Sequence, residues 1–135
     1  MAEAQVLETF GRFPILASEA ISFLDLVYFD GTDWQKANSD TASLAEIAAA
    51  VCVSRDGIAS GEYGEAALCA LIQDTDAPYT EQAEYYLTAA GSFSTTKDSD
   101  SGDAPQIVGK GISDSLLFLY PGIELDEAAA VVANA

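Results

Sequence analysis

Short runs of β-forming residues, each ended by a turn signal, dominate the sequence from residue 21 onward. Residues 25–29 (DLVYF) precede a turn at 30–33 (DGTD), and residues 34–37 (WQKA) return as a partner strand, so this segment predicts a hairpin. A second hairpin is predicted from residues 84–88 and 92–96, across the turn 89–91. Further strands are expected at residues 47–54, 66–73, 105–113 and 115–120. With 135 residues, the chain is expected to form one all-β domain.

The two predicted hairpins belong to a weak internal repeat with an offset of 58 to 60 residues. Corresponding positions are Tyr28 and Tyr86, Trp34 and Phe93, and Ile47 and Ile107. Each half contains a hairpin, a polar loop and a further strand. Two units are too few for a solenoid, which needs at least about three repeats. We therefore predict a small β-barrel or sandwich built from two similar hairpin-containing halves.

Residues 1–20 are expected to form an extended N-terminal arm. Apolar residues recur there without a period of 2 or 3.6, and Gly11 and Pro14 interrupt any helix. The segment is too hydrophobic for a free tail, so it should pack on its own domain, on a neighbouring subunit or on a larger partner. The β-domain is predicted to cover residues 21–122. Residues 123–135 are rich in Ala and Glu and are expected to form a short helix or a tail.

Apolar positions within the expected strands define a predicted core. Its members are Val27, Phe29, Trp34, Ile47, Val51, Val53, Leu68, Leu71, Tyr86, Phe93, Ile107, Ile112, Leu117 and Leu119. Cys52 and Cys69 also lie within apolar runs and are expected to be small buried residues, with a single bridge between adjacent strands left open.

The charge of the chain excludes several classes of partner. There are 22 acidic and 5 basic residues, so the net charge is −17 at pH 7. Such a surface repels phosphate, and neither nucleic acid nor an anionic membrane is expected to bind. No apolar run is long enough to span a bilayer, and the N-terminus does not have the pattern of a secretory signal. Evenly distributed carboxylates are typical of proteins that work in concentrated salt; an acidic protein from an ordinary or marine host is the alternative.

The residue types also argue against catalysis. The chain has no histidine, which removes the commonest general base and the commonest zinc ligand. The loop 98–103 (DSDSGD) presents carboxylates, but Gly109 stands where a calcium loop of the helix-loop-helix kind has its glutamate. We expect a protein that is not an enzyme and that has no catalytic residue, no metal site and no cofactor.

Several segments together resemble the head-decoration (cement) proteins of tailed bacterial and archaeal viruses. The likeness covers about residues 21–122 and is carried by residues 21–34 (ISFLDLVYFDGTDW), 48–54 (AAAVCVS) with 61–62, 84–96 (EYYLTAAGSFSTT), 106–113 (QIVGKGIS) and 117–121 (LFLYP). Leu24 and Ala49 depart from the pattern, because that family usually has glycine at these two positions.

The resemblance implies a non-enzymatic β-rich protein that binds the outside of an assembled capsid, commonly as a trimer. Its partners would be the major capsid protein and two further copies of itself, and it would be made in the host cytoplasm and reside on the virion. In this reading the N-terminal arm contacts neighbouring coat subunits. The expected contact residues are Val6, Leu7, Phe10, Phe13 and Ile15.

Two alternative functions remain open. The same hairpin pattern recurs in tail, fibre and spike components of these viruses, which contact the host surface. A carbohydrate-binding β-domain is the second alternative, because the chain is rich in aromatic residues that can form a sugar-binding platform: Tyr28, Trp34, Tyr63, Tyr79, Tyr85, Tyr86 and Phe93.

The excess of carboxylates predicts that the fold depends on salt. Because screening within about 3 Å at 1 M salt removes most repulsion between surface charges, stability should fall as salt is withdrawn. Thermal unfolding followed by circular dichroism in molar and in dilute sodium chloride measures this dependence. A midpoint that does not change with salt would contradict the salt-adapted interpretation.

Overall fold

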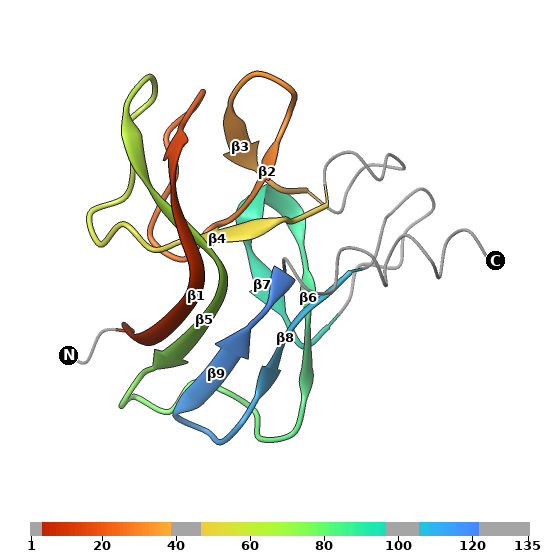
Figure 1. The fold of residues 1–135 in the computed structure, drawn as a ribbon. Helices are drawn as coiled ribbons and strands as arrows, with labels where there is room; N and C mark the ends of the chain where they lie inside the picture. The colour runs from red at the N-terminus through yellow and green to blue at the C-terminus, as the bar shows by residue number, and fades with distance from the viewer. Residues whose placement is uncertain (1–3, 39–46, 97–105, 122–135) are drawn as a thin grey trace, which may run out of the picture.

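β-strands are the main secondary structure in the part of the chain that the structure describes (Figure 1). The computed structural model describes residues 4–38, 47–96 and 106–121. Within these ranges the strands are β1 (Gln5–Leu16), β2 (Leu26–Phe29), β3 (Trp34–Lys36), β4 (Ala50–Cys52), β5 (Tyr63–Gln73), β6 (Glu84–Leu87), β7 (Phe93–Ser94), β8 (Ile107–Gly111) and β9 (Leu116–Leu119), with a short 3₁₀-helix, η2 (Ala89–Gly91). The all-β prediction is confirmed. The predicted C-terminal helix or tail and the acidic loop 98–103 lie outside the described residues.

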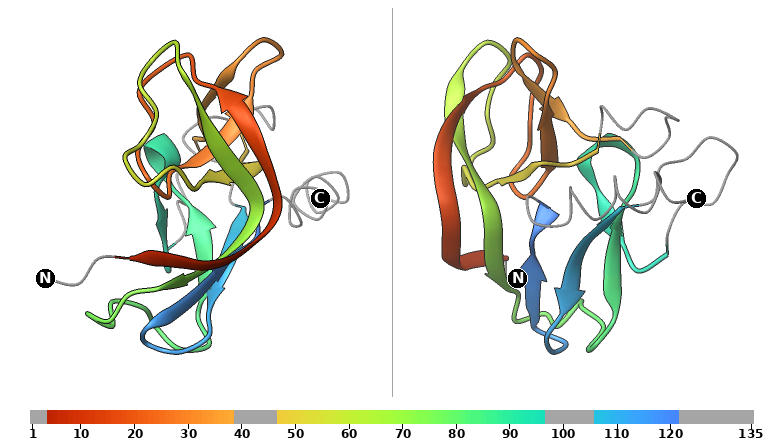
Figure 2. Two further views of the ribbon diagram at one scale, coloured as in Figure 1. Left: turned by 60° about the vertical axis from the view of Figure 1, so that its left-hand side comes forward. Right: turned by 45° about the vertical axis from the view of Figure 1, so that its right-hand side comes forward.

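The strands form one antiparallel sheet, and Figure 2 shows that this sheet curls into a half-barrel. The order along the sheet is β3-β2-β4-β5-β9-β8-β6-β7, and β1 pairs with β5 beside this path. β5 therefore has three neighbours. β1 runs along it from Gln5↔Gln73 to Leu16↔Tyr63, whereas β4 pairs with residues 66 and 67 and β9 pairs with residues 70–73.

The strand order has the same pattern from either end, in agreement with the two similar halves predicted from the repeat. In one half, the hairpin β2–β3 is followed by β4 and β5; in the other, the hairpin β6–β7 is followed by β8 and β9. The registers also correspond, because Phe29 pairs with Trp34 and Leu87 pairs with Phe93. The halves meet where β5 pairs with β9.

The segment expected to be an extended N-terminal arm contains β1, an edge strand of the same sheet, so of the three expected packing partners it uses its own domain. β1 pairs with β5 over its whole length, and the described part of residues 1–20 packs on its own domain. Two local features let this sequence form a strand. Pro14 lies in an edge strand, where a missing N–H is tolerated. Gly11 has a φ of 69° and lies under Leu68, whose side chain is 2.8 Å from the position that a Cβ would occupy.

Two clusters of buried side chains form the core. The larger includes Leu26, Val51, Ile72, Leu87, Leu117 and Leu119, and the smaller includes Ile15, Ile21, Val27, Cys52 and Ile58. Six predicted core residues are buried, namely Val27, Ile47, Val51, Val53, Leu117 and Leu119. Five others are only partly buried: Trp34, Leu71, Tyr86, Phe93 and Ile107. The prediction is wrong for Phe29, Leu68 and Ile112, which are 51%, 42% and 47% exposed.

Irregular strand pairing explains part of these errors. The register of β6 with β8 shifts between Tyr85 and Tyr86, and Tyr85 is buried in place of Tyr86. In β8, Val108 is buried in place of Ile107. A one-residue irregularity moves side chains to the opposite face of a sheet, so simple alternation assigns the wrong neighbour to the core.

A buried glutamine links the two halves. The side chain of Gln106, which is 1% exposed, donates from Nε2 to the carbonyl of Ala48 over 2.9 Å and accepts the Ala48 N–H at Oε1 over 2.7 Å. The backbone carbonyl of Gln106 accepts the N–H of Leu87 over 2.9 Å. The chain segment before β4 is thereby joined to the segment before β8.

We predict that Gln106→Leu destabilises the fold by about 3 kcal/mol, because it leaves the buried N–H and C=O of Ala48 without partners. Chemical denaturation measures the change, with Gln5→Leu at an exposed position as the matched control. The control should lie within about 0.5 kcal/mol of the wild type. Equal effects of the two substitutions would show that the Gln106 bridge contributes nothing specific.

Candidate contact surface

The structure separates the five predicted contact residues on β1 into exposed and buried groups. Leu7 and Phe10 are 47% and 58% exposed. Val6 packs partly against the larger core cluster, and Phe13 packs partly against the smaller one. Ile15 is 1% exposed within the smaller cluster, so it holds the domain together and cannot contact a partner in this conformation.

Two backbone irregularities set the positions of the exposed residues on β1. The register with β5 shifts between Val6 and Glu8, which leaves Leu7 as the extra residue of a β-bulge. Phe10 is the register partner of the buried Cys69 and directly precedes Gly11 with its positive φ. On the neighbouring strand, Leu68 is also exposed. Exposed apolar side chains therefore gather on the β1–β5 ribbon.

A cluster of three aromatic rings lies where β1, β2 and β3 approach one another. The ring of Trp34 is 5.4 Å from that of Phe13 and 5.6 Å from that of Phe29, at interplanar angles of 51° and 46°. Phe29 is half-exposed, and Trp34 is partly buried between its two neighbours. The sequence singled out Trp34 for a sugar-binding platform, but the tilted rings do not form a flat face.

A hollow of about 300 Å³ lies beside β1 and has an unusual lining for so acidic a chain. Its lining residues are Gln5, Val6, Arg12, Phe23, Val53 and Arg55. Arg12 and Arg55 are the two arginines of the whole sequence. A second hollow of about 430 Å³ shares Phe23 and Arg55 with the first, so the two hollows adjoin.

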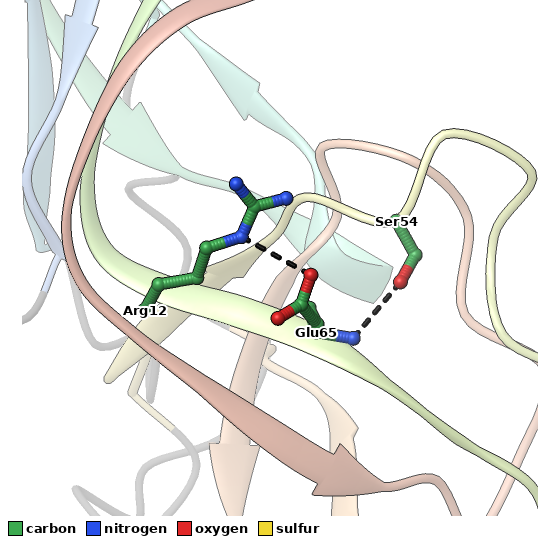
Figure 3. A network of polar contacts seen from close by, with 3 residues as sticks. All are labelled: Arg12, Ser54 and Glu65. Atoms are coloured by element: carbon green, nitrogen blue, oxygen red, sulfur yellow. Dashed lines mark hydrogen bonds and ion pairs between the residues drawn. The ribbon is translucent and has the colours of Figure 1, made fainter.

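A short polar network connects Arg12, through Glu65, to the turn that carries Arg55 (Figure 3). Arg12 Nε lies 3.2 Å from Glu65 Oε1, and the backbone N–H of Glu65 donates to Ser54 Oγ over 2.9 Å. Ser54 begins a tight turn, because its carbonyl accepts the N–H of Gly57 over 2.9 Å. Figure 3 shows the guanidinium of Arg12 beside the carboxylate of Glu65, with the marked contact made through Nε.

The turn before β2 supplies the aromatic wall of the hollow. The guanidinium of Arg55 lies over the ring of Phe23, 5.7 Å from its centroid, and Nη1 donates to the carbonyl of Ala4 over 3.5 Å. The turn is closed by Asp25, whose N–H donates to the Ser22 carbonyl and whose Oδ2 accepts the Ser22 N–H over 2.8 Å. Leu24 in this turn has a φ of 72°, a conformation that glycine adopts more readily.

The remaining sequence predictions concern the cysteines, possible metal ligands and helices that could cross a membrane. Cys52 and Cys69 are both buried and free, so they form no bridge, and burial raises the pKa of both thiols. No group of three Cys, Asp or Glu side chains suited to a metal ion occurs among residues 4–38, 47–96 and 106–121. In the same ranges, no helix has the length and apolarity required to cross a membrane.

Comparisons with protein families, with curated proteins and with solved structures found no match.

We predict that Asp25→Asn stabilises the protein at neutral pH. Burial raises the pKa of the Asp25 carboxyl above its value in the unfolded chain. Its protonation therefore stabilises the fold at a pH below the unfolded pKa, and this stabilisation is lost as the pH rises through the pKa of the folded state. Asparagine keeps an acceptor for the Ser22 N–H but carries no charge. Urea denaturation at pH 7 and near pH 3 should show a gain at pH 7 that shrinks at the lower pH.

Asp30→Asn is the matched control with the opposite sign. Hydrogen bonds from the N–H groups of Asp33 and Thr32 lower the pKa of Asp30, so its contribution is present at neutral pH and is lost as the pH falls through the folded value. This variant should lose stability at pH 7 and approach the wild type in acid. If both variants changed stability at pH 7 in the same direction, the opposite pKa shifts of Asp25 and Asp30 would be contradicted.

Proposed function

We propose that this chain is a non-enzymatic virion structural protein that decorates the outside of a tailed-virus capsid and bridges neighbouring major capsid subunits. The observation that carries the proposal is the edge strand β1 with its exposed Leu7 and Phe10, on a chain with a net charge of −17. Apolar side chains that stay exposed on so acidic a protein are suited to a protein–protein contact.

The outer edge of β1 adds a second kind of contact. Among the described residues, β5 is the strand that pairs with β1, and the opposite backbone edge of β1 has no strand partner. Because an edge strand presents unpaired N–H and C=O groups, an extended segment of the coat protein can add to it. In this proposal β1 stays in its own sheet and receives a partner strand.

The proposed oligomer is a homotrimer on the capsid surface. A single domain of 135 residues offers a small contact, whereas three linked copies convert several weak contacts into a persistent one. The chain would be made in the host cytoplasm and incorporated into the virion. No cofactor and no catalytic residue enter the proposal.

Two rival functions make different predictions. A tail, fibre or spike component would be present in far fewer copies per particle than a capsid decoration protein, so the copy number in purified virions separates them. A carbohydrate-binding domain would use Trp34, whose ring lies in a tilted cluster with those of Phe13 and Phe29. Saturable binding in a glycan titration, abolished by Trp34→Ala, would support that rival.

The double variant Leu7→Ser with Phe10→Ser tests the proposed capsid contact. The expected result is a loss of capsid affinity of about tenfold or more, because interface contacts lose about 1 kcal/mol or more for each large apolar side chain removed from a contact centre. Cosedimentation with capsids assembled from the major capsid protein of the same genome measures the affinity.

The matched control is Ile112→Ser with Phe29→Ser. Ile112 has the same exposed fraction as Leu7, 47%, and Phe29 is 51% exposed compared with 58% for Phe10, but neither control residue lies on the β1–β5 ribbon. Both double variants should melt close to the wild type. Equal losses of binding, or no loss with the β1 variant, would refute the proposed contact surface.

A further inference from the structure

We infer that the arginine-lined hollow beside β1 binds carboxylate side chains from a second copy of this chain. The inference concerns a contact between two copies of the chain. It rests on the proposed function, because the homotrimer proposed there supplies the number of copies. The hollow is lined by Gln5, Val6, Arg12, Phe23, Val53 and Arg55 and has a volume of about 300 Å³.

Both arginines of the chain line this one hollow. Arg12 belongs to β1, and Arg55 belongs to the turn that follows β4, so the two arginines come from distant parts of the sequence. The fold brings both to one hollow, although the chain has only 5 basic residues among 135. A planar guanidinium can form two parallel hydrogen bonds with one carboxylate, which lysine cannot do.

Each arginine already has partners within its own chain that favour one orientation of its side chain. Arg12 contacts Glu65 through its Nε atom, which leaves its two terminal nitrogens outside the contact that the structure shows (Figure 3). Arg55 is aligned by the ring of Phe23 and by the carbonyl of Ala4. Groups that are already oriented lose less conformational entropy when a ligand binds.

Charge complementarity favours a second copy of the chain as the occupant of the hollow. A second copy carries 22 acidic residues, so its surface has the chemistry that two guanidinium groups recognise. Val6 and Val53 add an apolar part to the lining, which suits a carboxylate side chain that has an apolar neighbour. In the proposed homotrimer, each hollow would meet the acidic surface of the next copy, and three such head-to-tail contacts would close the ring.

Salt conditions decide whether such a contact can form. Two copies with a net charge of −17 repel each other in dilute buffer. In molar salt the screening length is about 3 Å, so long-range repulsion is removed while pairs at hydrogen-bond distance and their apolar surroundings keep much of their attraction. The contact should therefore be stronger in molar salt than in dilute buffer.

The test is sedimentation equilibrium in molar salt with two matched double variants. Arg12→Gln with Arg55→Gln removes both guanidiniums from the hollow, and Lys36→Gln with Lys110→Gln removes the same charge elsewhere. We expect the wild type to associate. The arginine variant should lose at least about tenfold in self-association affinity, and the affinity of the lysine variant should stay within about twofold of the wild type. Thermal melts of both variants show whether the fold is intact.

Three outcomes would overturn the inference. They are a wild type that stays monomeric at every protein concentration, equal weakening by the two double variants, and no weakening by the arginine variant. Capsid cosedimentation keeps this result separate from the proposed function. If the protein binds capsids but its self-association does not depend on the arginines, only the inference about the hollow is refuted. If it self-associates through the arginines but does not bind capsids, the proposed function is refuted.

Discussion

The pairing of β5 with three other strands is the interaction on which the rest of the structure depends. β1 occupies one edge of β5, while β4 and β9 share the other, so this strand connects the hairpin of each half to the edge strand. Ala66, Ala67 and Ala70 are fully buried within it. Gly64 lies so close to Ile58 that a Cβ atom would overlap the isoleucine side chain. Small residues let the sheet curl tightly around β5.

The relation between the halves follows from the same strand. Because β5 pairs with β9, the two hairpin units join through their last strands, and the strand order becomes symmetric. Gln106 adds a second connection between the halves through the backbone of Ala48. Ala48 lies just before β4, and Gln106 lies just before β8, the corresponding strand of the other half. A buried amide that satisfies two backbone groups fixes this approach more specifically than an apolar side chain would.

The hairpins were predictable from the sequence because their signals are local. The turn at residues 30–33 contains Asp-Gly, and the flanking residues are β-formers, so nothing outside the segment is needed to recognise it. β1 was harder to recognise as a strand of the sheet. The bulge at Leu7 and the positive φ at Gly11 disturb the alternation of its apolar residues, and the long pairing with β5 becomes evident only in three dimensions.

The candidate surfaces show the same limit. Leu7 and Phe10 were found because their hydrophobicity is unusual in an acidic chain, whereas Ile15 shared that signal and is a core residue. The arginine hollow was missed because Arg12 and Arg55 lie far apart in the sequence. The sequence does contain one signal for this site, because the chain has only two arginines against 22 acidic residues.

Both proposed contacts involve the same strand. Val6 and Arg12 contribute to the lining of the hollow, while Leu7 and Phe10, between them in the sequence, are exposed. In the proposed assembly, a second copy binds on the hollow side of β1 and a coat segment binds at its outer edge. β1 is paired on one side by β5 alone, so each contact would hold this edge strand more firmly in the sheet.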